Sequence, residues 1–291
     1  MSRIFNYKNF LRLNHVIMFV LVLLTLFPFL YMLAVSFSSS RAVMASEVFL
    51  LPKDFNLVAY SHVLKQDQFW IGYKNTVLYT ALGTSISLTL TIMAAYPLSK
   101  KNLYGGPLVM KFMIFTMFFS GGLIPNFILI RDLGLYDTMW AMVLPGAMNA
   151  YNVMIMKTFF QGIPDDLKSA AKIDGLTDIG VLMRVVLPLS KPIIATIGLF
   201  MAVWLWNEWF MSLIYLKSDV KRPVAMYLRN IVLGAMNTIK SGQQMDQHSA
   251  KTVPATLQAS TIMLTSIPIL CVYPFVQKYF AKGILIGSVK G

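Results

Sequence analysis

The sequence predicts an all-α membrane protein with six transmembrane helices. Of the 291 residues, 57% are apolar and only 13% are charged, whereas a soluble domain carries about 25% charged residues. The apolar residues gather in six runs of roughly 20 residues, the length that a helix needs to cross a hydrocarbon core of about 30 Å. No stretch is polar enough to cover a separate soluble domain, so residues 1–291 are expected to form one transmembrane domain.

The first three spans are predicted at residues 16–37, 75–98 and 110–130. The third run contains Gly122 and Pro125. Glycine and proline breaks at membrane depth are tolerated only where neighbouring groups or a cavity satisfy the freed backbone groups. We therefore expect the third span to be interrupted.

The last three spans are predicted at residues 138–156, 192–216 and 254–279, and the first of these contains a Pro-Gly pair. An even number of spans places both chain ends on one side of the membrane. Lys and Arg favour the cytoplasmic side, and 14 of them fall on the side that holds both ends, against 11 on the other. Both termini and the polar connection 157–191 are therefore predicted to be cytoplasmic.

The formal net charge of the chain is +13. The basic residues are spread along the ends of the apolar segments, without the compact basic patch and interleaved aromatic residues of a nucleic-acid site. Membrane topology explains most of the excess, so no nucleic-acid partner is expected. A second explanation stays open, in which part of the charge attracts anionic solutes.

No catalytic signature is found in the sequence. His15, His62 and His248 are far apart, and none has a metal-ligand spacing. There is no G-x-S-x-G motif and no G-x-x-x-x-G-K-[ST] loop to hold nucleotide phosphates. We therefore expect neither an enzyme nor a cofactor or metal site in this chain, and any ATP-driven work must come from another polypeptide.

Within the connection 157–191, the residues from Pro164 to Gly175 predict a short helix. Proline suits a first helical turn because its missing N–H is not needed there. Asp165 and Asp166 favour the positive N-terminal end of a helix. Gly175 should end the helix, because glycine takes the left-handed conformation without penalty. The residues in the middle are small, so another backbone could approach closely there.

A second short helix is predicted after the first. Thr177 or Asp178 can cap its N-terminus. Pro188 should stop it near Leu187, because proline lacks an N–H donor and disfavours helical geometry in the residue before it.

The spacing of this connection resembles the cytoplasmic loop of ABC-importer permeases, written as E-A-A, two residues, D-G, nine residues and I-x-L-P. The matching residues are Ser169-Ala170-Ala171, Asp174-Gly175, Val185, Leu187 and Pro188. Ser169 stands where the pattern has an acid, and Val185 where it has isoleucine. Over most of its length the chain resembles the second permease subunit of carbohydrate-uptake ABC importers, of the maltose-importer smaller-permease type. Within that group it is similar to the branch for complex oligosaccharides such as alginate or pectin fragments.

This resemblance implies the type I ABC-importer permease architecture, with a cytoplasmic coupling helix in a coupling loop at residues 157–191. It implies a bacterial inner-membrane protein whose partners are a second homologous permease, two ATPase subunits that bind ATP and Mg, an extracytoplasmic solute-binding protein, an oligosaccharide and membrane lipid. The residues expected to couple to the ATPase are Asp165, Asp166, Leu167, Ser169, Ala170, Ala171, Asp174, Gly175, Leu187 and Pro188.

The fifth predicted span holds a dense cluster of aromatic and polar residues: Trp204, Trp206, Asn207, Glu208, Trp209 and Phe210. Within it, the candidate contact residues are Trp206, Asn207, Glu208 and Trp209. Aromatic faces stack on sugar rings while amides and carboxylates bond to hydroxyl groups, so this cluster is a candidate sugar contact. Tryptophan also gathers at membrane interfaces without any ligand, and Glu208 could instead pair with Arg131 or another basic residue.

Four more polar residues lie at span depth, and each could contact a solute or tie helices together: Asn126, Asn149, Tyr151 and Asn152.

The predicted function is therefore that of a permease subunit for sugars, with oligosaccharides, including acidic ones, as the expected class. Two alternatives remain at this stage. The first is an ABC-importer permease for another solute, such as an amino acid or polyamine. The second is a secondary transporter, which should show inverted repeats and coupling-ion sites, and neither is visible in the sequence.

Overall fold

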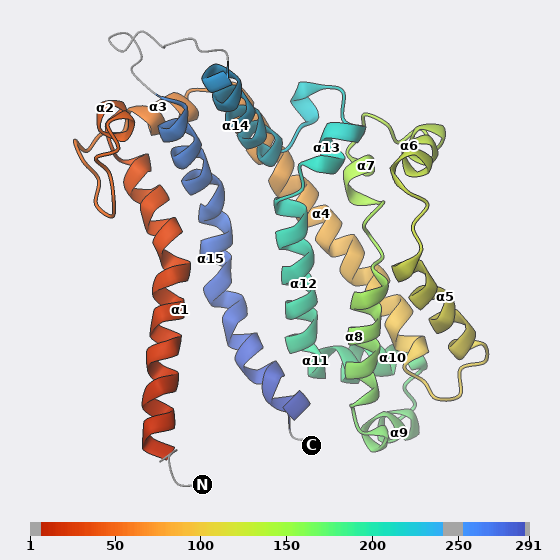
Figure 1. The fold of residues 1–291 in the computed structure, drawn as a ribbon. Helices are drawn as coiled ribbons and strands as arrows, with labels where there is room; N and C mark the ends of the chain where they lie inside the picture. Colours follow the sequence, from red (N-terminus) through yellow and green to blue (C-terminus); the bar gives the residue numbers. More distant parts are fainter. Residues whose placement is uncertain (1–6, 241–252, 289–291) are drawn as a thin grey trace. The chain divides into compact units, whose positions relative to one another are not determined.

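A computed structural model describes residues 7–240 and 253–288. These residues form helices joined by turns and loops, with no strand among them (Figure 1). The predicted all-α class is therefore confirmed. The chain divides into two compact units, which consist of residues 1–69 with 228–267 and of residues 70–227 with 268–291.

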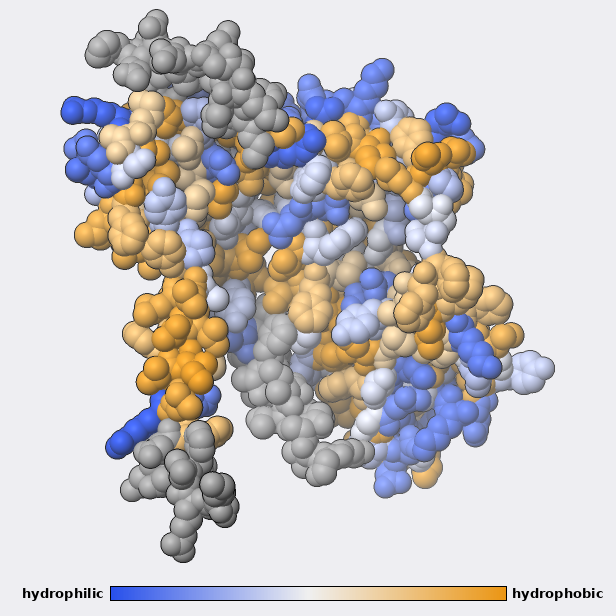
Figure 2. All heavy atoms as spheres, in the orientation of Figure 1, coloured by the Kyte–Doolittle hydropathy of each residue, from blue (hydrophilic) through white to orange (hydrophobic). Residues whose placement is uncertain are grey.

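The first unit contains a long apolar helix and two short ones. These are α1 (Tyr7–Ser36), α2 (Ser40–Met44) and α3 (Val58–Leu64), together with parts of α14 (Val224–Lys240) and α15 (Pro254–Ser288). Its core is small and consists of Ala34, Val35, Ala42, Val48 and Ala259. The apolar side chains along α1 are exposed, and Figure 2 shows a hydrophobic surface over much of this helix, with hydrophilic residues toward its N-terminal end.

The second unit begins within α4 and carries most of the remaining helices. Their bounds are α4 (Asp67–Leu98), α5 (Gly106–Phe118), α6 (Leu123–Asp132), α7 (Trp140–Val143), α8 (Ala150–Gln161), α9 (Asp165–Ile173), α10 (Asp178–Val181), a π-helical turn (Leu182–Val186), α11 (Leu187–Leu189), α12 (Lys191–Trp206), α13 (Phe210–Tyr215) and a 3₁₀ turn (Asp219–Lys221).

Two glycines let α4 and α12 approach each other closely. A Cβ on Gly83 of α4 would lie 2.6 Å from the side chain of Leu205, and one on Gly198 of α12 would lie 3.2 Å from that of Leu88. Membrane helices use small residues in this way, because close backbone approach increases van der Waals contact. These two helices and α8 carry much of the core of the second unit.

The predicted interruption of the third span is confirmed. α5 ends at Phe118 and α6 begins at Leu123, and the two helices meet at 114°. Gly122 supplies the turn with φ +89°, a conformation that side-chain-bearing residues rarely adopt.

The prediction of one helix over residues 138–156 for the fourth span is wrong, because this segment contains two separate helices. The helix α7 stops at Val143, and α8 begins only at Ala150 and continues to Gln161, inside the predicted coupling loop. Pro145 lies between them, and proline has no N–H to donate to the next hydrogen bond of the helix. The fifth span, predicted over 192–216, is likewise divided, because α12 ends at Trp206.

Three helices in the described part of the chain are long and apolar enough to cross a membrane: Phe10–Ser36 of α1, α4, and Pro254–Pro274 of α15. Two bent pairs bring this number to five if each pair is one span, namely α5 with α6 and the segment Asp178–Leu189 with α12. The count of six spans stays a prediction.

Candidate functional site

The first helix of the polar connection forms where its sequence predicts. α9 runs from Asp165 to Ile173, with both aspartates in its first turn. Pro164 lies one position earlier than expected, as the capping residue with an extended backbone. Asp174 caps the other end, and Gly175 follows with φ +82°, the left-handed conformation that ends a helix.

The second helix begins as predicted and ends later. Thr177 caps α10, and its Oγ1 accepts a hydrogen bond from the Gly180 N–H at 3.3 Å. The helical path continues through the π turn and α11 to Leu189, two residues beyond the predicted end near Leu187. Pro188 is tolerated because it lies in the first turn of α11, where its missing N–H is not needed.

One face of α9 is fixed to the membrane part of the second unit. Ala171 is buried and shares a core with Phe160 of α8, Val181 of α10, Ala95 of α4 and Ile197 of α12. The cluster therefore joins α9 to the helices α4, α8 and α12 through packed side chains. A movement of α9 would be transmitted to these helices, since packed interiors resist deformation.

The other face of α9 is exposed. Ser169 and Ala170 point away from the core, and Ile173 at its end is 86% exposed. Exposed apolar side chains also occur at Ile179 and Met183 just beyond the helix. Small residues flanked by exposed apolar ones form a surface on which a partner can pack closely, and such patches mark interaction sites.

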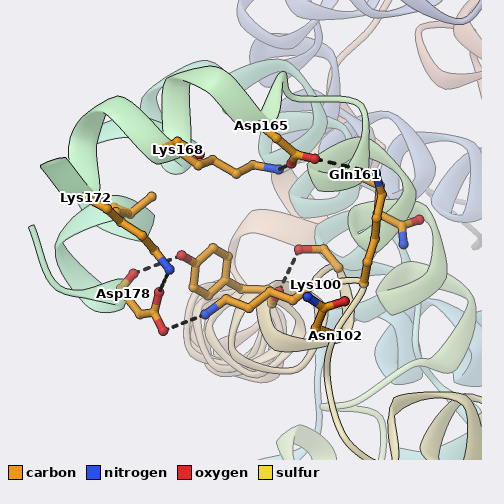
Figure 3. A pocket seen from close by; sticks show the side chains of 12 residues that line it. Lys100, Asn102, Gln161, Asp165, Lys168, Lys172 and Asp178 are labelled. Carbon is orange, nitrogen blue, oxygen red and sulfur yellow. Dashed lines mark hydrogen bonds and ion pairs between the residues drawn. The ribbon is translucent and has the colours of Figure 1, made fainter.

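A cavity of about 700 Å³ lies between α9, α10 and the end of α4 (Figure 3). Asp165 Oδ1 pairs with Lys168 Nζ at 3.3 Å, and its Oδ2 pairs with Lys101 Nζ at 3.5 Å. Lys168 Nζ also donates to the carbonyl oxygen of Phe160 at 3.1 Å, which ties α9 to α8. The hydrogen bond from Lys168 is the main reason why the pKa of Asp165 is lowered.

Asp178 joins three elements around the same cavity. Its carboxylate pairs with Lys100 Nζ at 2.7 Å, after α4, and with Lys172 Nζ at 3.2 Å, on α9. The Tyr96 hydroxyl donates to its backbone oxygen at 3.0 Å. The hydrogen bonds from Lys100 and then Lys172 lower the pKa of Asp178, so the carboxylate stays charged at neutral pH and holds α4, α9 and α10 together.

This cavity was not predicted as a site from the sequence. Four lysines and two aspartates line it, Lys100, Lys101, Lys168, Lys172, Asp165 and Asp178. They belong to three segments of chain, and the lysine pair at 100–101 was interpreted only as a topology signal. The positive excess favours anionic groups at this surface.

The aromatic cluster of the fifth span lies at a helix break. Trp206 is buried and packs edge-on against Tyr73 at 5.7 Å between ring centroids. Asn207 is exposed and its amide donates to the Val203 oxygen at 2.8 Å. Glu208 Oε1 accepts a hydrogen bond from the Met211 N–H, in the first turn of α13, at 2.8 Å.

The structure answers the question of the Glu208 partner. Among the described residues, the ion pair of Arg131 is with its neighbour Asp132, at 3.4 Å, and not with Glu208. Trp209 packs against Phe210 at 5.6 Å and remains partly exposed.

The polar residues of the fourth span separate into two groups. Asn149 caps α8 and accepts from the Asn152 N–H at 3.2 Å, and the buried Asn152 amide lies 3.1 Å from Met201 Sδ of α12. Asn149 therefore caps its own helix, whereas Asn152 ties α8 to α12. Tyr151 and Asn126 are exposed, and both remain available to a solute.

Trp204 of α12 lies beside the break between α7 and α8, although it was not among the residues expected to contact the sugar. A Cβ on Gly146 would lie 2.7 Å from its indole ring, so the ring lies across the Pro-Gly connection before α8. The ring is also partly exposed. The sequence gives no local signal for this contact, because the two residues are 58 positions apart.

A second structural site that the sequence analysis missed centres on Asp137. Its Oδ1 accepts from the N–H groups of Lys217 and Ser218, each at 3.0 Å. Its Oδ2 accepts from Ser218 Oγ at 2.6 Å and pairs with Lys221 Nζ at 3.0 Å. The bonds from Ser218 are the main cause of its strongly lowered pKa.

Within the described residues, no group of three or more His, Cys, Asp or Glu side chains is placed to hold a metal ion. The polar side chains described above make helix caps, ion pairs and a cationic cavity. The arrangement is therefore that of helices interrupted at membrane depth and joined to an exposed polar helix.

The chain belongs to the family described as the binding-protein-dependent transport system inner membrane component, whose model matches residues 87–286. It is therefore a permease component of an ABC transporter, as the coupling-loop motif predicted. The alternative of a secondary transporter does not fit this family.

Two relatives from Bacillus subtilis (strain 168) are each 42% identical. One is Protein LplC, matched over 268 residues that cover 92% of this chain and 90% of the relative. The other is the polygalacturonan/rhamnogalacturonan transport system permease protein YtcP, matched over 273 residues that cover 92% and 94%.

A solved structure is also similar in both fold and sequence. It is a bacterial ABC transporter involved in the import of the acidic polysaccharide alginate, with a TM-score of 0.84 and 33% identity, covering 96% of this chain and all of that one. The predicted type I permease fold is confirmed by this likeness.

Proposed function

We propose that this chain forms half of the translocation pathway of an ATP-driven importer of oligosaccharides, with acidic oligosaccharides as the substrate class. The support comes from two relatives whose names specify acidic polysaccharides, polygalacturonan or rhamnogalacturonan in one and alginate in the other. The other half is a second, homologous permease. The amino-acid and polyamine alternative has no comparable support among the relatives described above.

The observation that carries the proposal is the construction of α9. One face is locked into the core of the second unit through Ala171, and the opposite face presents Ser169 and Ala170 to solvent. A separate ATPase subunit, which holds ATP and Mg, docks on this exposed face from the cytoplasm. Two such subunits serve the two permeases.

Coupling then follows from rigid packing. The ATPase subunits bind nucleotide with different affinity in their open and closed arrangements, so nucleotide binding shifts them between the two. A part of the permease that moves with the ATPase subunits transmits this shift to the transmembrane helices. The ion pairs of Asp178 and the core around Ala171 make α9, α10 and α4 one such element. A solute-binding protein delivers the sugar on the other side.

The proposed sugar path passes the helix breaks of the second unit. The exposed faces of Trp204 and Trp209 suit stacking on sugar rings. Asn207 at the end of α12 and Tyr151 on α8 offer exposed polar groups. Trp206, Asn149 and Asn152 support this path by packing or capping instead of direct contact.

The test is reconstitution of the chain with its co-expressed partner permease and ATPase subunits in lipid nanodiscs. ATP hydrolysis is measured with the solute-binding protein and one of three solutes: oligogalacturonate, an uncharged malto-oligosaccharide or a polyamine. We expect stimulation by oligogalacturonate. Stimulation by the polyamine alone would contradict the substrate class but leave the permease function intact.

The docking face is tested by Ala170→Phe, with Ala45→Phe as the matched control on an exposed alanine of the first unit. A clash at the centre of an interface costs roughly 2 kcal/mol or more, about 30-fold in affinity. We expect Ala170→Phe to lose co-purifying ATPase while its membrane insertion is unchanged, and Ala45→Phe to retain it. Equal ATPase retention by both variants would contradict the assignment of α9.

A further inference from the structure

The loop that follows α2 in the first unit is closed at its base. Glu47 and Lys53 form an ion pair at 2.5 Å across it. The Lys53 N–H donates to Ser38 Oγ at 3.0 Å, and its carbonyl oxygen accepts from the Ser39 N–H at 3.1 Å. These bonds hold the two ends of the loop together and fix them beside the end of α1.

The tip of this loop is strongly apolar. Phe49 is 65% exposed, Leu50 is 43% exposed and Leu51 is 80% exposed. The preceding Val48 is buried with Ala34 and Val35 of α1 and holds the tip in place. Three consecutive large apolar side chains facing water are unfavourable, because apolar surface is more stable away from water. This tip therefore favours an apolar environment.

The tip reaches back along α1. The Phe49 ring lies 5.6 Å from the ring of Phe27, measured between centroids. Phe27 precedes the end of α1 at Ser36 by nine residues, a distance of about 13 Å at 1.5 Å per residue. Figure 1 shows the loop beside the end of α1 that leads into α2.

The surface around Phe27 is that of a membrane span. The most apolar part of the stretch Phe10–Ser36 has a mean hydropathy of 2.7, and none of that part is buried in the protein. One half of a hydrocarbon core is about 15 Å thick. A contact about 13 Å from the end of the span therefore places the tip at the depth of the acyl chains, while the Glu47–Lys53 pair stays near the polar surface.

We propose that the loop tip Phe49–Leu51 inserts into the acyl chains of the membrane leaflet at the Ser36 end of α1. The apolar surface of the tip is continuous with that of α1, so one lipid layer covers both. The loop then acts as a lipid anchor for the connection between α1 and α3. This inference concerns the first unit and does not depend on the substrate or on ATPase docking.

The experiment places an environment-sensitive label on single cysteines in a Cys271→Ser background, in the transporter reconstituted in liposomes. Leu51→Cys tests the tip, Leu24→Cys on the exposed face of α1 is the membrane control, and Lys65→Cys after α3 is the aqueous control. Quenching is measured with lipids spin-labelled near the headgroup or near the chain end, and with iodide in water.

We expect the fluorescence of the label at position 51 to be quenched by the spin-labelled lipids and protected from iodide. Lipids with the spin label near the headgroup should quench it more strongly than they quench the label at position 24. Lys65→Cys should show the opposite pattern. Iodide quenching without lipid quenching at position 51 would overturn the proposal. Protection from both quenchers would also overturn it, since the tip would then be covered by another protein subunit.

Discussion

At the residue scale, Asp137 joins two loops that are about 80 residues apart in the sequence. The residue has φ +55°, and its own N–H donates to the Tyr215 oxygen at 2.9 Å. Its carboxylate then accepts from backbone and side-chain donors at 217–221. A carboxylate can serve this many donors because each oxygen accepts more than one hydrogen bond.

We predict that Asp137→Asn lowers the thermal stability of the purified transporter at neutral pH. Asparagine tolerates the left-handed backbone, so the change isolates the loss of charge and of one acceptor oxygen. Hydrogen bonds to charged groups contribute roughly 1.5–3 kcal/mol each, and we expect a total loss at the lower end of that range. The measurement is the unfolding midpoint followed by intrinsic fluorescence.

The pH dependence of this loss has a definite sign. Because the folded protein lowers the pKa of Asp137, the stabilisation is present above the ordinary aspartate pKa of about 4 and decreases as the pH falls below it. The gap between wild type and variant should therefore narrow in acid. Asp132→Asn, at an exposed ion pair, should change the unfolding midpoint little at any pH. An equally large loss of stability in Asp132→Asn would show that the effect is not specific to the Asp137 hydrogen bonds.

At the element scale, the break between α7 and α8 is matched to α12. Gly146 provides space for the indole of Trp204, and Asn152 contacts Met201 one turn earlier on α12. An interrupted helix in a membrane needs neighbours that cover its freed backbone groups. The side chains of α12 fill that role for this break.

We predict that Gly146→Ala destabilises this packing, because its Cβ would lie 2.7 Å from the Trp204 ring. Overpacking of this kind costs typically 1–3 kcal/mol. The double variant Gly146→Ala/Trp204→Phe, with a smaller ring, should recover part of the loss, as measured by a double-mutant cycle on unfolding midpoints.

Gly234→Ala on α14 is the matched control, because a Cβ there meets nothing within 4 Å. It should leave the midpoint unchanged or raise it, since alanine favours a helix. Strictly additive effects of the Gly146 and Trp204 changes would show that the two residues do not interact.

At the scale of the whole molecule, the described part of the chain carries hydrophilic residues around α9 and a hydrophobic surface on α1 (Figure 2). Both features agree with a membrane protein of the permease family. The side on which each polar segment lies is a prediction from the distribution of Lys and Arg.

We predict that the turn after α4 faces the cytoplasm and the 3₁₀ turn after α13 faces the opposite side. Tyr104→Cys and Val220→Cys, both at strongly exposed positions, are to be compared in a Cys271→Ser background with a membrane-impermeant maleimide. In intact cells we expect Val220→Cys to react and Tyr104→Cys to react only after lysis. The reverse pattern would place α9 outside and end its assignment as the ATPase contact.

The sequence by itself determined the fold class, the family and the position of the short polar helix α9. Asp165, Asp166, Gly175 and Thr177 act within one or two turns of chain, where helix capping and backbone conformation are set by the residue type itself. The motif spacing depends on the same local rules. These features could therefore be predicted before any tertiary contact was known.

Only the tertiary structure decided which side chains meet. Three features join segments that are distant in the sequence: the lysine-lined cavity, the hydrogen bonds and ion pair of Asp137, and the contact of Trp204 with Gly146. It also showed that Trp206 is buried, whereas its position in the sequence suggested a sugar contact. Composition and periodicity report the environment that a helix prefers. A contact between two helices also depends on how the helices are rotated relative to each other and where each is interrupted, and packing sets both.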